Sequence, residues 1–121
     1  MIRRAWLFIG WLGVVFALAF SLGPSLLDKD SGQADKLVHL ASYATLMFWW
    51  AQLVVRRRWR LALAVILYGI LIEGLQGLTP NRQPDVLDAL ANSTGVLIGW
   101  LAAHLLPNLP ARLAALPAFR R

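Results

Sequence analysis

Residues 85–99 read DVLDALANSTGVLIG, an apolar stretch in which polar and small residues recur at regular intervals. Asp88, Asn92, Gly95 and Gly99 follow one another at steps of four, three and four. Because an α-helix turns once every 3.6 residues, these positions share one helical face. Two glycines four residues apart allow another helix to approach closely, so we expect this face to point into a helix bundle. A second copy of the chain is an alternative partner for the Gly95/Gly99 face, and the chain would then form an oligomer.

Four segments of the chain are long and apolar enough to cross a membrane. Of its 121 residues, 59% are hydrophobic, against roughly 45–50% in soluble domains. The segments cover residues 6–22, 37–55, 61–78 and 86–106. Each is close to the roughly 20 residues that a helix needs to cross a hydrocarbon core. A bilayer offers no water to backbone groups, so the sequence predicts an all-α integral membrane bundle of four transmembrane helices, with residues 1–121 as a single domain.

The basic residues are distributed unevenly, and this predicts the orientation of the bundle. Nine of the twelve fall on one side if the chain crosses four times: Arg3, Arg4, Arg56, Arg57, Arg58, Arg60, Arg112, Arg120 and Arg121. Lysine and arginine are enriched on the cytoplasmic side, so both termini are predicted to be cytoplasmic. Apolar runs separate the basic residues, which argues against nucleic acid as a partner. The lipid bilayer of a bacterial inner membrane, crossed several times, is the expected environment.

The two ends of the chain need separate interpretations. Arg3 and Arg4 precede the first apolar segment, and Ala17 and Ala19 near its end are compatible with signal-peptide cleavage. The length of the apolar run favours a membrane anchor, which is expected to contribute mainly apolar packing. Residues 107–121 contain three prolines and three arginines. We expect a basic cytoplasmic tail, short and interfacial, rather than a fifth crossing.

All six acidic residues are predicted to lie on the opposite, extracytoplasmic side. They are Asp28, Asp30, Asp35, Glu73, Asp85 and Asp88. An ionisable group inside the membrane is costly when it faces lipid, so Glu73 is expected to face the bundle and to find a partner there. We expect His39, Glu73 and Asn92 to meet in one cluster near the outer third of the bilayer.

Structural roles are the alternative for several of these polar residues. Asp35 is suited to cap the second helix, and Asp85 is suited to cap the fourth helix after Pro84. Tyr43 continues the stripe of Asp35 and His39 at steps of four, but it is also suited to an aromatic belt at the membrane surface. For Glu73 the alternative is a buried hydrogen-bonding network without further function.

With these residues assembled, the chain resembles the VanZ-like family. The resemblance rests on DKLVHLASY at 35–43, EGLQ at 73–76 and NRQPDVLDALANSTG at 81–95, and it covers about residues 24–106. It implies a small membrane protein of about four helices, in a family named for teicoplanin resistance. No established catalytic reaction comes with it. It also implies that the family's polar positions are Asp35, Lys36, His39, Tyr43, Glu73, Gln76, Arg82, Asp88 and Asn92.

Three functions fit this set of residues. The first is to bind or handle an envelope lipid or a lipid-linked cell-wall component, with Lys36 and Arg82 holding an anionic phosphate or carboxylate. The second is a membrane-embedded hydrolase or transferase. Its catalytic candidates are His39, Glu73 and Asp88, acting as acid and base or as ligands of a divalent cation. The third is a structural or accessory membrane subunit. Nucleophile motifs, a His-x-x-x-His pair and a phosphate loop are absent from the sequence, which favours the first function.

The arginine asymmetry generates a prediction of topology. The chain has no natural cysteine, so single cysteines introduced as Asp30→Cys and Arg56→Cys can be labelled selectively. A membrane-impermeant maleimide added to intact spheroplasts is expected to label position 30, and to reach position 56 only after the membrane is opened. Labelling of position 30 from the cytoplasmic side alone would invert the bundle and show that the predicted orientation is wrong.

Overall fold

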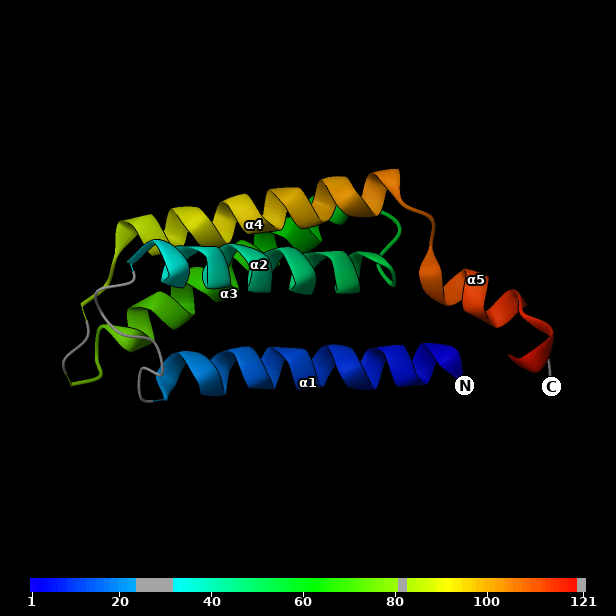
Figure 1. Ribbon diagram of the computed structural model, residues 1–121, viewed down its shortest axis with the longest axis horizontal. Helices are drawn as coiled ribbons and strands as arrows, with labels where there is room; N and C mark the ends of the chain where they lie inside the picture. The colour runs from blue at the N-terminus through cyan, green and yellow to red at the C-terminus, as the bar shows by residue number, and fades with distance from the viewer. Residues whose placement is uncertain (24–31, 81–82, 120–121) are drawn as a thin grey trace.

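The described part of the chain is helical throughout. The computed structural model describes residues 1–23, 32–80 and 83–119. In this part, the prediction of an all-α bundle is confirmed, with no strand (Figure 1). The helices are α1 (Ile2–Leu22), α2 (Gly32–Ala51), α3 (Arg58–Gln76), α4 (Val86–Leu105) and α5 (Leu109–Ala115), followed by the 3-10 turn Pro117–Phe119. Residues 108–119, the described residues after 107, thus include a seven-residue helix and a turn, too short for another crossing.

Three of the four long helices are apolar enough to cross a membrane. By length and composition these are Ile2–Leu22, Arg58–Gln76 and the stretch Val86–Ala115 that contains α4 and α5. At 20 residues α2 has a similar length, but its first half carries Asp35, Lys36 and His39. Helix α2 lies between α1 and α4 (Figure 1), and its described buried residues, Tyr43, Leu46, Met47 and Ala51, all lie in its second half. The polar residues of its first half stay partly exposed at the end of the bundle.

Close packing of α2 against α4 is made possible by glycine. A Cβ at Gly95 would collide with the backbone carbonyl of Leu40, and one at Gly99 would collide with the carbonyl of Ala44. This is the largest interface between helices of the bundle. The Gly95/Gly99 face is therefore occupied by α2 of the same chain. An oligomer formed through this face would require α2 to leave the two glycines, and it stays a prediction.

Helix α1 is attached through hydrogen bonds as well as apolar contacts. Trp6 and Trp49 stack with their ring centroids 3.8 Å apart, and each indole N–H donates to the other residue's backbone carbonyl, at 3.0 and 2.9 Å. Farther along, the Tyr68 hydroxyl donates to the carbonyl of Val14 at 2.6 Å. The expectation of mainly apolar packing is thus incomplete, because α1 also offers backbone carbonyls as acceptors.

Arg58 joins the ends of α2 and α4. Its guanidinium donates to the carbonyl of Ala51 at 2.9 Å and to the carbonyl of Ala103 at 3.0 Å. The last carbonyls of a helix have no partner within the helix, so an arginine that reaches two helix ends supplies donors that lipid cannot. Arg58 therefore has a structural role in addition to the orientation signal assigned to the arginines.

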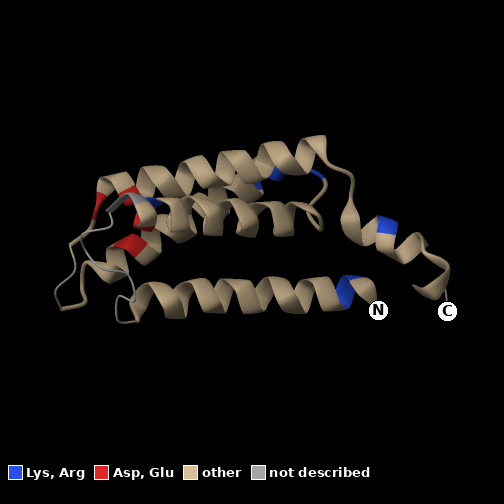
Figure 2. Ribbon diagram, in the orientation of Figure 1, with Lys and Arg blue, Asp and Glu red and all other residues tan. Residues whose placement is uncertain are grey.

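The charges separate along the bundle. Figure 2 shows the described acids gathered at the end of the bundle that lies farthest from the two termini, and the contacts of Lys36 with Asp85 and Asp88 place it at the same end. The other described basic residues lie toward the opposite end, where both termini are found (Figure 1). Four crossings, if all four long helices span the membrane, would place both termini on one side, in agreement with this arrangement. The structure thus places the candidate residues at one end, and the side of the membrane that this end faces stays a prediction.

Glycine packing generates a prediction of stability. Gly95→Ala places a methyl group on the Leu40 carbonyl, and overpacking of this kind typically costs about 1–3 kcal/mol. Gly74→Ala is the matched control, since a Cβ there meets nothing within 4 Å and alanine is the better helix former. Thermal unfolding in detergent is expected to show a lower midpoint for Gly95→Ala alone. An unchanged midpoint would mean that the contact of α2 with α4 does not need glycine.

Candidate functional site

Seven polar residues from three helices meet at the end of the bundle away from the termini. We call them the polar cluster: Asp35, Lys36 and His39 of α2, Glu73 of α3, Asp85 at the start of α4, and Asp88 and Asn92 of α4. Six of them are joined in two groups, one around Lys36 and one around His39, and Glu73 joins the first group through the backbone of Asp85.

Lys36 is held between two carboxylates of α4. Its Nζ lies 3.2 Å from Oδ2 of Asp85 and 2.9 Å from Oδ1 of Asp88. Both contacts that the structure gives this ammonium group are thus to carboxylates of the chain, and a role of Lys36 in holding an anionic ligand stays a prediction. Arg82, the other residue expected to hold the anion, lies outside the described residues.

His39 is oriented by Asn92. The Nδ1 atom of His39 lies 2.9 Å from Oδ1 of Asn92, whose side chain is buried at 3% exposure. An amide oxygen only accepts hydrogen bonds, so this contact requires the proton of a neutral imidazole to sit on Nδ1. The Nε2 atom then carries the lone pair and lies 3.8 Å from Oδ2 of Asp35. His39 thus presents a basic nitrogen toward the carboxylate one helical turn away.

Glu73 faces the bundle, as predicted. It is 7% exposed, and its Oε1 accepts a hydrogen bond of 2.7 Å from the backbone N–H of Asp85. The other oxygen, Oε2, is buried without a partner among the described residues. Glu73 is joined to the rest of the polar cluster through the backbone of Asp85, and within the described part of the chain no hydrogen bond or ion pair joins it to His39. The predicted meeting of His39, Glu73 and Asn92 is therefore indirect.

The two aspartates expected to cap helices behave differently. Asp85 caps α4, because its Oδ1 accepts from the N–H of Leu87 at 2.8 Å. That hydrogen bond, followed by the contact with Lys36, lowers the pKa of Asp85 below its ordinary value of 3.8. Asp35 is not a cap, since α2 already begins at Gly32 and places Asp35 inside the first turn. The expected role fails because the helix starts three residues earlier.

Tyr43 and Gln76 are the described candidate residues that do not belong to the polar cluster. Tyr43 is 4% exposed, which excludes the aromatic-belt interpretation. Its ring lies where a Cβ of Gly69 would be, and its hydroxyl is buried without a partner among the described residues. The side-chain amide of Gln76 donates to the carbonyl of Ser21 at 2.7 Å. Gln76 therefore connects α3 to α1 at the same end of the bundle.

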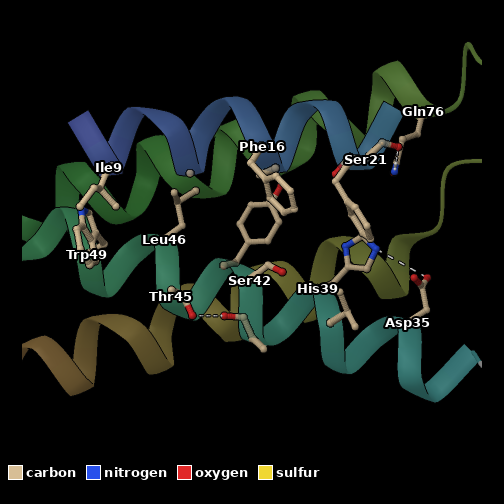
Figure 3. A pocket seen from close by; sticks show the side chains of 17 residues that line it. Ile9, Phe16, Ser21, Asp35, His39, Ser42, Thr45, Leu46, Trp49 and Gln76 are labelled. Carbon is tan, nitrogen blue, oxygen red and sulfur yellow. Dashed lines mark hydrogen bonds and ion pairs between the residues drawn. The ribbon is translucent and has the colours of Figure 1, made fainter. Parts of the chain in front are cut away.

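A groove of about 530 Å³ runs between α1 and α2. Figure 3 shows Asp35, His39 and Gln76 at one end, with Phe16 and Leu46 farther along. We call this cavity the α1/α2 groove. Its full lining is Ile9, Gly10, Gly13, Phe16, Ala17, Phe20, Ser21, Asp35, Val38, His39, Ala41, Ser42, Tyr43, Thr45, Leu46, Trp49 and Gln76. Most of its lining is apolar, Ser42 and Thr45 add hydroxyl groups along it, and its charged groups lie at one end only.

The groove is not among the features expected from the sequence. The available signal was the run of small residues on the first segment, Gly10, Gly13 and Ala17, at steps of three and four. Such spacing places small side chains on one helical face. It predicts close approach of a helix and an open groove equally well, so it does not decide between them.

The contacts of Lys36 generate a prediction with a pH dependence. Lys36→Met removes the cation between Asp85 and Asp88, so unfolding in detergent at pH 7 is expected to have a slightly lower midpoint. The pKa of Asp85 is lowered in the folded state, so its stabilising contribution is present above the unfolded pKa and is lost as the pH falls through the folded pKa. The two midpoints are therefore expected to converge on acidification. Lys36→Arg is the matched control and is expected to keep the wild-type profile. A constant difference at every pH would mean that Lys36 acts through packing.

Comparison with known proteins identifies the family. No curated protein and no solved structure matched the chain. The family model described as VanZ/LLP1 matches residues 2–107, a range that holds α1 to α4 and all seven residues of the polar cluster. The match includes α1, which the resemblance covering about residues 24–106 left out. The chain, matched over most of its length, therefore belongs to the VanZ/LLP1 family.

Proposed function

We propose that the protein binds an envelope lipid or a lipid-linked cell-wall component at the extracytoplasmic side of a bacterial cytoplasmic membrane. The hydrocarbon chain of the lipid lies in the α1/α2 groove, and its head group lies beside Asp35 and His39. The observation that carries the proposal is the form of the groove, which is apolar along most of its length and polar at one end. This distribution matches an amphiphile that enters head outward.

The size and lining of the groove suit a hydrocarbon chain. Its volume of about 530 Å³ lies within the roughly 300–1,000 Å³ typical of small-molecule sites. Phe16, Leu46 and Ile9 offer apolar contacts along its walls. Between lipid and protein, such contacts stabilise mainly through packing, because bulk lipid is equally apolar. Selectivity for one lipid must therefore come from the polar end.

The polar end offers groups that ordinary acyl chains cannot satisfy. Asp35 and His39 line the groove, and Gln76 lies beside them on α3. A carboxylate and an imidazole at membrane depth are costly without partners. A lipid head group brings hydroxyl, phosphate or amine groups to this depth, and these can bond to the two side chains. If the bound lipid is a cell-wall precursor, the same site provides a link to glycopeptide resistance.

The contacts favour binding over catalysis. Among the three catalytic candidates only His39 lines the groove. The Glu73 carboxylate is turned to the backbone of Asp85, and Asp88 is paired with Lys36. A hydrolase or transferase needs its acid and base within reach of one reacting bond. Asp88 lies close to His39, but its pairing with Lys36 occupies it, and Glu73 is turned away from both.

A purely structural role is supported less well. A scaffold network is expected to be closed and fully paired, since unpaired buried polar groups destabilise a protein. Here Asp35 and His39 line a groove, and Glu73 Oε2 and the Tyr43 hydroxyl are buried without partners among the described residues. Groups of this kind favour a site over a scaffold.

Filling the groove tests the proposal. A Cβ at Gly13 meets only Leu46, at 3.9 Å, so Gly13→Phe places a ring in the groove without a backbone clash. Gly74→Phe is the matched control on α3, where a Cβ meets nothing within 4 Å. Each protein is purified in mild detergent, and lipid that remains bound is measured by native mass spectrometry. Gly13→Phe is expected to lower bound lipid about tenfold, a loss of about 1.4 kcal/mol. Equal lipid on both variants would exclude the groove as the lipid site.

A further inference from the structure

We infer that Asp35, His39 and Asp88 form a binding site for a divalent transition-metal cation at the polar end of the α1/α2 groove. One imidazole nitrogen and two carboxylate oxygens form a ligand set that suits Zn²⁺ or Mn²⁺. The inference that a metal binds depends only on residues of the polar cluster. Only its use toward a lipid head group rests on the proposed function.

The three ligand atoms converge from two helices. One atom from each residue lies within 4.8 Å of the other two. Two ligands on one ion are at most about 4.4 Å apart, twice a metal–oxygen distance of about 2.2 Å. The side chain of Asp35 is 45% exposed and free to rotate by the small amount that closes the difference. Asp88 keeps a second oxygen for the ion while its Oδ1 contacts Lys36.

His39 is already oriented as a metal ligand. Metal-binding histidines almost always donate their other ring N–H to a fixed acceptor, which sets the tautomer and the ring direction. The Nδ1 atom of His39 lies 2.9 Å from the buried amide oxygen of Asn92. The lone pair of Nε2 is thereby turned toward Asp35. Asn92 takes no part in the ligand set, so this support is independent of the carboxylates.

The charge balance calls for a cation. Among the described residues, this end of the bundle holds four carboxylates, those of Asp35, Glu73, Asp85 and Asp88, against the single ammonium group of Lys36. One oxygen of Glu73 is buried without a partner in the described part of the chain. Excess negative charge beside a low-dielectric membrane is unfavourable, and a divalent cation offsets it.

A bound cation changes what the groove accepts. Lys36 is engaged by Asp85 and Asp88, and the carboxylates repel a phosphate. A divalent ion on Asp35 and His39, both of which line the groove, would leave positions open for a phosphate oxygen. The metal would then provide the positive charge for an anionic ligand that was expected from Lys36. The lipid that we infer for the groove therefore has a phosphate in its head group.

The test uses Mn²⁺ alone with the full chain in detergent. The purified protein is stripped with a chelator and freed of it, then titrated while the electron paramagnetic resonance signal of free Mn²⁺ is recorded. One saturable site per chain is expected. His39→Gln and Asp88→Asn are each expected to weaken it at least tenfold. Asp85→Asn is the matched control, because it also removes one negative charge beside Lys36 and asparagine still caps α4.

Two results would overturn the inference. One is the absence of saturable binding to the wild-type chain. The other is an equal loss in Asp85→Asn and Asp88→Asn, which would indicate general attraction by negative charge. If Asp88→Asn fails to fold, Asp35→Asn replaces it, since its carboxylate is partly exposed. Gly13→Phe separates the two proposals: it is expected to keep the Mn²⁺ site, and its loss of bound lipid concerns the groove alone.

Discussion

The backbones of α2 and α4 touch at Gly95 and Gly99, and the other features of the bundle depend on this contact. A side chain at either glycine would occupy the place of a carbonyl of α2. With the two helices this close, short side chains reach across the interface. Lys36 meets Asp88 at 2.9 Å and His39 meets Asn92 at 2.9 Å. Membrane helices gain little from apolar burial against each other, so close packing and hydrogen bonds must supply the stability.

Helix α1 is held in the bundle by hydrogen bonds and not by close packing of backbones at glycines. Side chains of α2 and α3 donate to its backbone carbonyls at Trp6, Val14 and Ser21, over most of its length. Hydrogen bonds at intervals hold a helix at a set distance without the continuous contact that glycines permit. Space therefore remains between α1 and α2, and the groove occupies it. One interface is tight and the other is spaced, and α2 takes part in both.

Much of the site could be predicted from helical periodicity. The stripes containing His39 and Asn92 are local properties of the sequence, and so is the cap at Asp85. The contacts across helices could not be predicted, because they depend on the relative rotation and height of the helices. The pairing of Lys36 with Asp85 and Asp88 is a contact of this kind. Asp35 failed as a cap because the sequence pattern does not fix where α2 begins.

The stacked pair of Trp6 and Trp49 has an optical consequence. Their rings are nearly parallel, with an interplanar angle of 9° and centroids 3.8 Å apart. Indoles in face-to-face contact couple their electronic transitions, and this coupling decays steeply with separation. Because one indole belongs to α1 and the other to α2, the near-ultraviolet circular dichroism of the protein contains a signal from the spacing of the two helices that form the groove. The chain thus carries its own chromophore pair for following the width of its cavity, without any attached label.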